Sequence, residues 1–277
     1  MPGFKFSQVN VFSADPLLGN PLAVVHDADS LSTERMSAIA RWTNLSETVF
    51  LVKPTNPKAD YAVRIFSPQV ELPFAGHPTL GACHAWLAAG GRPKNAGRVM
   101  QQCEVGLVTI GNNEGGLEFA APPLIRTGPL EPDVLNQIMK ALSLSPSDIA
   151  HHQWVDNGPG WCAIMLHSAR DVLALETEWA TLAPLNLGVI GLYDANADAT
   201  VEVRALIGDG GYEDPVTGSL NASLAQWLIP AGLVPSPYLA SQGTRLKRAG
   251  NVQLREADSD IWVGGDVVDV ISGEISV

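Results

Sequence analysis

The sequence contains two segments built on one plan and separated by a constant offset of 142 residues. Residues 72–90 read LPFAGHPTLGACHAWLAAG, and residues 214–232 read DPVTGSLNASLAQWLIPAG. Each begins with a turn of small residues, continues as an apolar helical stretch and ends in Ala-Gly. This repeat predicts two similar domains, each presenting a helix N-terminus, which face each other across a cleft. The matched positions are Glu71 and Glu213, Ala75 and Thr217, Gly76 and Gly218, and His77 and Ser219.

Short strand-like and helix-like segments follow one another along the whole chain. A helix with Ser32 as its N-cap is expected to end near Arg41, and a hairpin is expected around the turn GNNEGG, between residues 105–110 and 117–120. The order lacks the regular strand–helix alternation of a doubly wound sheet, so the predicted class is α/β (α+β). Other predicted strands lie at 5–13, 22–25, 48–52, 61–66, 160–166, 188–193, 201–207 and beyond Asn251, and other helices at 78–89, 134–142 and 219–229.

A proline-rich stretch, APPLIRTGPLEP at residues 121–132, is typical of an interdomain link. It places the predicted domains at residues 1–120 and 121–265.

The net charge limits the kinds of molecule that this protein is expected to bind. The 277 residues carry 17 Lys and Arg against 29 Asp and Glu, a net charge of −12. Such a chain repels phosphate backbones and anionic lipid, so we expect no nucleic-acid or membrane partner. No apolar run approaches the ~18 residues of a membrane span, and the three cysteines form no CxxC pair. A soluble, cytoplasmic protein without a metal site is expected.

The glycines of the repeated turns are the first functional candidates. Gly76 and Gly218 each precede a helix, whose first N–H groups and dipole favour a bound anion. The alternative is that both glycines only permit tight turns.

Three ionisable residues could carry proton chemistry. Glu47, in NLSETVF, enters a strand that should be half buried, and burial suits a carboxyl to proton exchange near neutral pH. His77 directly precedes Pro78 at a predicted N1 position, where a helix N-terminus keeps an imidazole neutral. Asp214 precedes Pro215 and is therefore extended. The alternatives are a strand-end carboxylate for Glu47, a capping or core histidine for His77 and a loop-forming role for Asp214. Ser219 is a candidate helix cap that could also bind a ligand.

Four segments resemble the PhzF family of phenazine-biosynthesis-like isomerases and epimerase-like proteins: FSADPLLGNPLAVV, NLSETVF, RIFSPQVELPFAGHPTLGA and GYEDPVTGSLNASLAQWL. They occur in the family order and cover both halves of the chain. The resemblance implies a diaminopimelate-epimerase-like fold of two pseudo-symmetric domains, each a curved, mostly antiparallel sheet around a central helix. It also implies that a C-terminal strand, residues 266–277, completes the first domain.

The resemblance further implies Glu47 as the general acid/base, with His77 and Asp214 assisting proton transfer and binding polar groups. Related racemases use two cysteines where this chain has Ala75 and Thr217, which cannot act as thiol bases. A proton-transfer isomerase acting on a small carboxylate, without flavin, nicotinamide or metal, is therefore expected, and it should be a homodimer. Single-carbon epimerisation and a non-catalytic binding or interaction module are the alternatives. The expected substrate-binding residues are Asn20, Gly76, Gly218 and Ser219.

Overall fold

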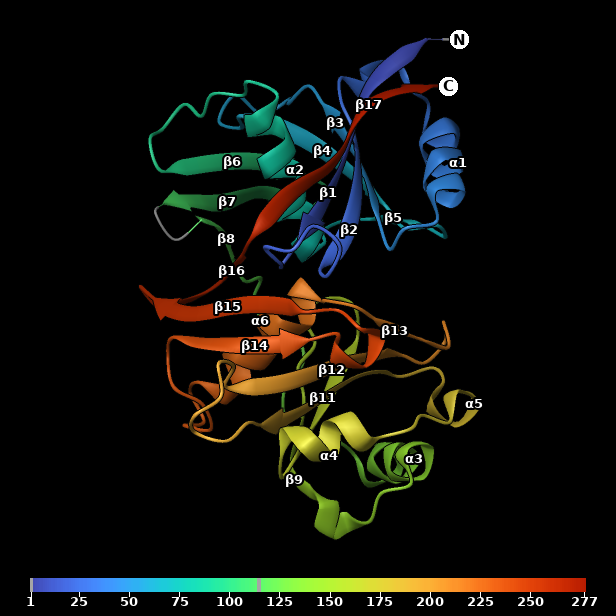
Figure 1. Cartoon of the computed structure of the whole chain (residues 1–277), viewed down its shortest axis with the longest axis vertical. Helices are drawn as coiled ribbons and strands as arrows, with labels where there is room; N and C mark the ends of the chain where they lie inside the picture. Colours follow the sequence, from blue (N-terminus) through green and yellow to red (C-terminus); the bar gives the residue numbers. More distant parts are fainter. Residues whose placement is uncertain (1, 114–115) are drawn as a thin grey trace. The chain divides into compact units, whose positions relative to one another are not determined.

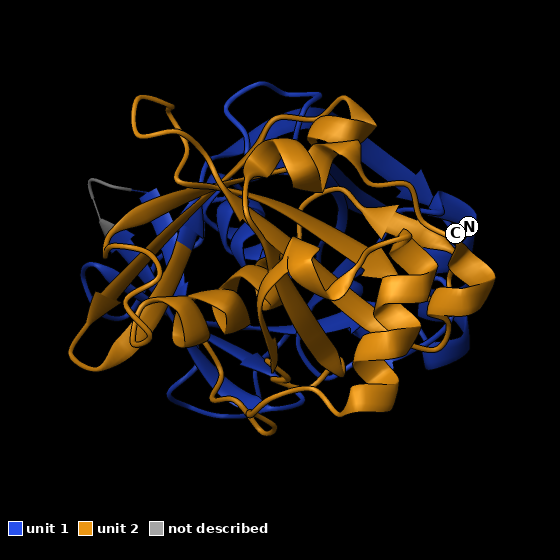
Figure 2. Ribbon diagram, turned by 90° about the horizontal axis from the view of Figure 1, so that it is seen from below, with its two compact units in different colours: residues 1–120, 264–277 blue, residues 121–263 orange. Residues whose placement is uncertain are grey.

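The computed structural model describes residues 2–113 and 116–277. The chain divides into two compact units (Figure 2), residues 1–120 with 264–277, and residues 121–263. We call them unit 1 and unit 2.

Unit 1 is a sheet wrapped around one helix (Figure 1). The C-terminal strand pairs antiparallel with the first strand along its length, from Gly3 opposite Ser276 to Val11 opposite Val267. From this edge the strand order is β17-β1-β2-β3-β4-β6-β7-β8, with parallel pairs at β2–β3 and β4–β6. The elements are β1 (Gly3–Val11), β2 (Asn20–Val25), α1 (Thr33–Thr43), β3 (Thr48–Val52), β4 (Tyr61–Phe66), β5 (Glu71–Leu72), α2 (Gly76–Ala88), β6 (Arg98–Cys103), β7 (Gly106–Asn113), β8 (Gly116–Ala120) and β17 (Val267–Ser276).

Unit 2 repeats this strand order. Its strands run β9-β10-β11-β12-β14-β15, again with two parallel pairs, β10–β11 and β12–β14. The elements are α3 (Pro132–Leu142), β9 (Ile149–Trp154), β10 (Trp161–Leu166), α4 (Ala169–Ala174), α5 (Trp179–Leu182), β11 (Asn186–Leu192), β12 (Val201–Ile207), β13 (Tyr212–Asp214), α6 (Gly218–Leu228), β14 (Tyr238–Gln242), β15 (Gly250–Ala257) and β16 (Asp260–Gly265).

In each unit, one strand pairs with two different strands along the same edge. In unit 1 this strand is β4, which pairs antiparallel with β5 at one end and parallel with β6 at the other. In unit 2, β12 pairs in the same way with β13 and β14. In both units the chain leaves the short antiparallel partner, turns and begins the central helix. The helix starts are therefore positioned by equivalent sheet geometry.

The central helices are buried almost all round, as a helix enclosed by a sheet must be. Helix α2 contacts β1, β2, β3, β6, β8 and β17. The missing side chain of Gly81 permits this approach, since a Cβ there would lie 2.5 Å from Leu22. In unit 2 a Cβ on Gly188 would lie 2.7 Å from Leu220 of α6. Close helix–sheet packing thus depends on a helical glycine in unit 1 and a strand glycine in unit 2.

Most of the predicted elements are confirmed. Ser32 is the N-cap of α1 and accepts from Arg35 N–H, and strands β3, β4 and β12 have the predicted bounds. Strands β7 and β8 reach further into the predicted hairpin turn, to Asn113 and from Gly116, and the two residues between them lie outside the described residues. Strands β5, β6, β9, β13 and β14 and the short helices α4 and α5 were not predicted.

The starts of the two central helices differ from the prediction. Helix α2 begins at Gly76 with Ala75 as its N-cap, so Pro78 is its third residue and not its first. Pro78 has no N–H group, and at this position in the first turn a helix leaves the N–H without an intrahelical partner. Helix α6 begins at Gly218 with Thr217 as its N-cap, so Ser219 lies inside the first turn and is not the cap.

The structure also shows the state of the cysteines and the character of the helices. The three cysteines, Cys83, Cys103 and Cys162, are buried free thiols. Among residues 2–113 and 116–277, no helix combines the length and the apolar character that crossing a membrane requires.

Candidate active site

The loop between α1 and β3 places Glu47. Helix α1 is followed by its C-cap Asn44, whose left-handed backbone (φ 52°) turns the chain toward β3. The hydroxyls of Thr43 and Thr48 lie 2.9 Å apart and tie the two ends of this loop together. Glu47 directly precedes β3, and its side chain is 17% exposed. Its carboxyl is therefore held mostly buried but within reach of solvent.

His77, the second residue of α2, lies against this carboxyl. Its Nε2 atom is 3.4 Å from Glu47 Oε2, and its side chain is 5% exposed. The other ring nitrogen, Nδ1, lies 3.5 Å from Nδ2 of the fully buried Asn20. Because the Asn20 amide donates to Nδ1, a neutral His77 ring carries its proton on Nε2. The site thus presents an N–H group to the Glu47 carboxyl.

The buried Asn10 in β1 stabilises the loop that positions Asn20. The Asn10 amide donates to the main-chain oxygen of Asp15 (2.8 Å) and accepts from Gly19 N–H (3.0 Å). Gly19 is required here, because a Cβ would lie 2.2 Å from the main-chain oxygen of Val11. Asn20, expected among the substrate-binding residues, therefore contacts the His77 ring.

Burial lowers the pKa of His77 to about 3, because the charged imidazolium would lose its hydration. The ring is therefore neutral at physiological pH. It can donate one hydrogen bond, but it does not act as a cation.

This low pKa predicts a pH-dependent stability. Between pH 6.5 and pH 3 the unfolded state binds a proton at His77 that the native state does not. The free energy of unfolding should therefore fall as the pH is lowered through this window, by about 2 kcal/mol between pH 7 and pH 5. In His77→Asn, the fall in the free energy of unfolding between pH 7 and pH 5, measured by urea unfolding, should be smaller than in wild type by about 2 kcal/mol. An equal loss in both proteins would contradict the assignment. The buried His26, whose pKa burial also lowers, acts equally in both.

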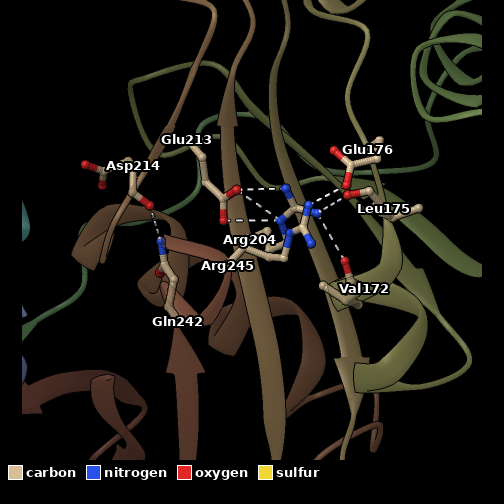
Figure 3. Close-up of polar contacts among 8 residues, drawn as sticks. All are labelled: Val172, Leu175, Glu176, Arg204, Glu213, Asp214, Gln242 and Arg245. Carbon is tan, nitrogen blue, oxygen red and sulfur yellow. Dashed lines mark hydrogen bonds and ion pairs between the residues drawn. The ribbon is translucent and has the colours of Figure 1, made fainter. Parts of the chain in front are cut away.

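Unit 2 places Asp214 at the end of β13. Its carboxyl accepts a hydrogen bond from the Thr217 hydroxyl. Its main-chain oxygen accepts from Gln242 Nε2 at 3.1 Å (Figure 3). The hydroxyl of Ser219 accepts from Trp161 Nε1 at 3.2 Å. Asp214, Gly218 and Ser219 are thus gathered in one turn and the first helical turn that follows it.

A buried ion pair anchors the strand that carries Asp214. Arg204 Nε and Nη2 both donate to the Glu213 carboxylate, at 2.8 to 3.2 Å, and both side chains are 5% exposed (Figure 3). Arg204 Nη1 also donates to the main-chain oxygens of Val172 and Leu175 at the end of α4. In unit 1, Glu71, the counterpart of Glu213 in the repeat, makes the same bidentate contact with Arg64, and both side chains are 30% exposed.

The two helix starts also present their first N–H groups. The first intrahelical bonds are Thr79 N–H to Ala75 oxygen in α2 and Asn221 N–H to Thr217 oxygen in α6. The N–H groups before these positions are those that a helix start leaves for other partners. Together with the helix dipole, they favour a carboxylate near Gly76 and Gly218.

Sequence reasoning missed the residues that support these helix starts, above all the buried Gln101 and Gln242. A signal for them exists: Gln242 follows Gln101 by 141 residues, and Asn221 follows Thr79 by 142, close to the repeat offset. In the part of the chain that the structure describes, no group of three His, Cys, Asp or Glu is placed to hold a metal ion.

Known proteins resemble this chain over most of its length. It is 35% identical to an uncharacterised isomerase of Pasteurella multocida, over 99% of this chain and 94% of that protein. It is 34% identical to the trans-2,3-dihydro-3-hydroxyanthranilate isomerase of Pseudomonas chlororaphis, over 82% of this chain and 80% of that enzyme. A PhzF-family phenazine biosynthesis protein of Enterococcus faecalis has the same fold, with a TM-score of 0.82, 22% identity and full coverage of both chains.

The epimerase-like fold and these relatives define the chain as an isomerase. It belongs to the PhzC-PhzF family of phenazine biosynthesis-like proteins, whose model matches residues 9–273.

Proposed function

We propose that this isomerase needs no cofactor and moves a proton between two carbon atoms of a small carboxylate metabolite, with Glu47 as the acid/base. The observation that carries the proposal is the Glu47–His77 pair: a mostly buried carboxyl lies 3.4 Å from a buried imidazole at the start of α2. Since His77 is neutral, its ring does not hold the neighbouring carboxyl in the ionised form as a cation would. Glu47 can then both accept a proton and return it.

The proposed reaction conserves all atoms and electrons. Glu47 takes a proton from a carbon next to a conjugated or carbonyl-like system, and the C–H electron pair spreads into that system. The carboxyl, which lies within reach of solvent and exchanges its proton with water, then gives a proton to another carbon, where a new C–H bond forms. Helix N-termini at Gly76 and Gly218, which we propose face one substrate in a cleft between the units, would stabilise the transient negative charge. Asp214 would assist the proton transfer and orient a polar group of the substrate.

Epimerisation at one carbon by two opposed thiols finds no support in the residues. The N-cap positions of the two central helices are held by Ala75 and Thr217. Neither side chain forms a thiolate, so a single carboxyl base is the simpler mechanism.

Deuterium incorporation from solvent tests the proposal. The first candidate substrate is trans-2,3-dihydro-3-hydroxyanthranilate, the acid in the name of the Pseudomonas chlororaphis relative. Further cyclic amino and hydroxy acids can be chosen by their ability to raise the melting temperature, because ligands stabilise the native state that binds them. In D₂O, NMR should show deuterium entering the acid as it isomerises. Acids that bind tightly but never exchange a proton would contradict the proposal and indicate a binding protein.

Ser219→Ala should raise the KM for the substrate about tenfold and change kcat little, since a hydroxyl contact shared by ground and transition states is lost. Steady-state kinetics on the substrate found above measure this. Trp161→Phe is the comparison variant: it removes the indole N–H that donates to the Ser219 hydroxyl, together with part of a buried ring, and leaves the hydroxyl in place. A KM raised equally in both variants would mean that the hydroxyl supports the protein and does not bind the substrate.

A further inference from the structure

The side chain of Gln242, at the end of β14, uses its whole hydrogen-bonding capacity around the turn that carries Asp214. It is fully buried. Its oxygen accepts from Thr217 N–H (3.0 Å) and from Asn221 Nδ2 (2.8 Å). Its nitrogen donates to the main-chain oxygen of Asp214 (3.1 Å) and to Thr217 Oγ1 (3.0 Å). Two donors and two acceptor positions are all that an amide has, so Gln242 ties together both ends of the turn.

These partners determine which way the amide points. A main-chain N–H can only donate, and a main-chain oxygen can only accept. Gln242 must therefore turn its oxygen to Thr217 N–H and its nitrogen to the Asp214 main-chain oxygen. A flipped amide would set donor against donor at Thr217 and acceptor against acceptor at Asp214.

The amide in turn determines the direction of the Thr217 hydroxyl. Because Gln242 Nε2 donates to Thr217 Oγ1, the hydroxyl proton is left for the second partner, which is the Asp214 carboxylate. The result is a directed chain from the Gln242 amide through the Thr217 hydroxyl to the carboxylate. Each link has one orientation that satisfies both of its neighbours.

Unit 1 shows that the fold does not require this chain. Gln101 holds the matching place, since it lies opposite Tyr61 in β4 as Gln242 lies opposite Val203 in β12. Its nitrogen donates to Thr79 Oγ1 (3.1 Å), and that hydroxyl donates to the main-chain oxygen of Ala75 (2.9 Å). The buried glutamine therefore supports a helix start in both units. Only unit 2 has a hydroxyl at the N-cap and a carboxylate joined to it.

We propose that Thr217 and Gln242 are positioning residues that hold the Asp214 carboxylate in the one orientation used on the substrate. This inference rests on the proposed function, in which Asp214 contacts the substrate. Thr217 thus has a different task from a thiol base at the same position: its proton stays on the hydroxyl and orients a neighbouring carboxylate.

Valine and serine at position 217 test the proposal. Thr217→Val keeps the shape of the side chain and removes the hydroxyl, whereas Thr217→Ser keeps the hydroxyl. Thr217→Val should lower kcat by about 10- to 100-fold with KM within about threefold of wild type, because a misplaced catalytic group costs rate more than binding. Thr217→Ser should stay within about threefold of wild type in both constants. Gln242→Glu, which replaces the donor facing Thr217 by a second acceptor, should resemble Thr217→Val.

Ile138→Val, in the buried core of unit 2, is the control for a purely structural loss. It should lower the melting temperature and leave kcat unchanged. Wild-type kcat in Thr217→Val would overturn the positioning role while leaving the proposed function standing.

Crystal structures of the two position-217 variants give a readout that does not depend on turnover. The Asp214 carboxylate should keep its orientation in Thr217→Ser and change it, or occupy two, in Thr217→Val. An unchanged carboxylate in Thr217→Val overturns the proposal whatever the activity. If wild-type protein exchanges no proton with any acid, the proposed function fails, and these two structures alone decide whether Thr217 orients Asp214.

Discussion

Glu47→Gln is expected to lower kcat by about 10²- to 10⁴-fold, the range that a positioned general acid/base contributes. Glutamine keeps the length and shape of glutamate and can still form hydrogen bonds, but it does not accept a proton at neutral pH. The fold should be unaffected, because glutamine fills the same space and the neutral His77 beside it loses no ion pair. Deuterium incorporation from solvent, followed by NMR, measures the loss directly. Substrate affinity, measured by calorimetry, should remain close to wild type.

Glu104→Gln is the matched control for this experiment. Glu104 is an exposed carboxylate of the same unit, and its replacement makes the same change of charge. It should leave both exchange and turnover unchanged. Exchange at the wild-type rate in Glu47→Gln would refute the single-base mechanism, and Asp214 and His77 would then be the remaining candidates. His77→Asn and Asp214→Asn are expected to lower kcat less than Glu47→Gln, since their proposed work is orientation and charge placement.

Arg204→Ala is expected to lower the free energy of unfolding by about 3–5 kcal/mol, because it leaves the Glu213 carboxylate buried without its partner. That is a large part of the roughly 5–15 kcal/mol that stabilises a typical folded protein. Two main-chain oxygens at the end of α4 lose their donor at the same time. Urea unfolding followed by tryptophan fluorescence measures the change. A double substitution of Arg204 and Glu213 by apolar residues should cost less than Arg204→Ala, because no buried charge remains.

Arg64→Ala in unit 1 provides the comparison within the same protein. Arg64 makes the same two-pronged contact with Glu71, but both side chains are 30% exposed, so water screens the pair and hydrates the charge that is left. The expected loss is about 1 kcal/mol or less. Equal losses from the two arginine substitutions would mean that burial does not decide the strength of this repeated contact.

Most of the fold could be predicted because its signals are local. The spacing of Met36, Ile39 and Ala40 behind Ser32 determines α1 and its buried face, and all three side chains are buried in the structure. Short runs rich in β-branched, aromatic and other apolar residues determine β3, β4 and β12, which are buried along most of their length. The 142-residue offset identified two matching helix starts, since the same turn residues precede the same kind of apolar helix. Strand β9 could not be found in this way: only one residue of its sequence IAHHQW is buried, and the sequence carries no clear alternation.

The candidate site, too, could be predicted from the sequence only in part. The sequence by itself determined which turns, carboxyls and helix starts to consider, because a glycine before an apolar helix is a signal within a few residues. Only the tertiary structure decided where the helices begin. Neither Ala75 nor Thr217 caps its helix with a side chain, and the supporting amides come from Gln101 and Gln242, on strands more than twenty residues away. Contacts between residues so distant in sequence depend on sheet pairing, which leaves no mark on the local pattern. The packing of α2 against β2 joins Asn20 to His77, and the pairing of β14 with β12 brings Gln242 to the Thr217 hydroxyl.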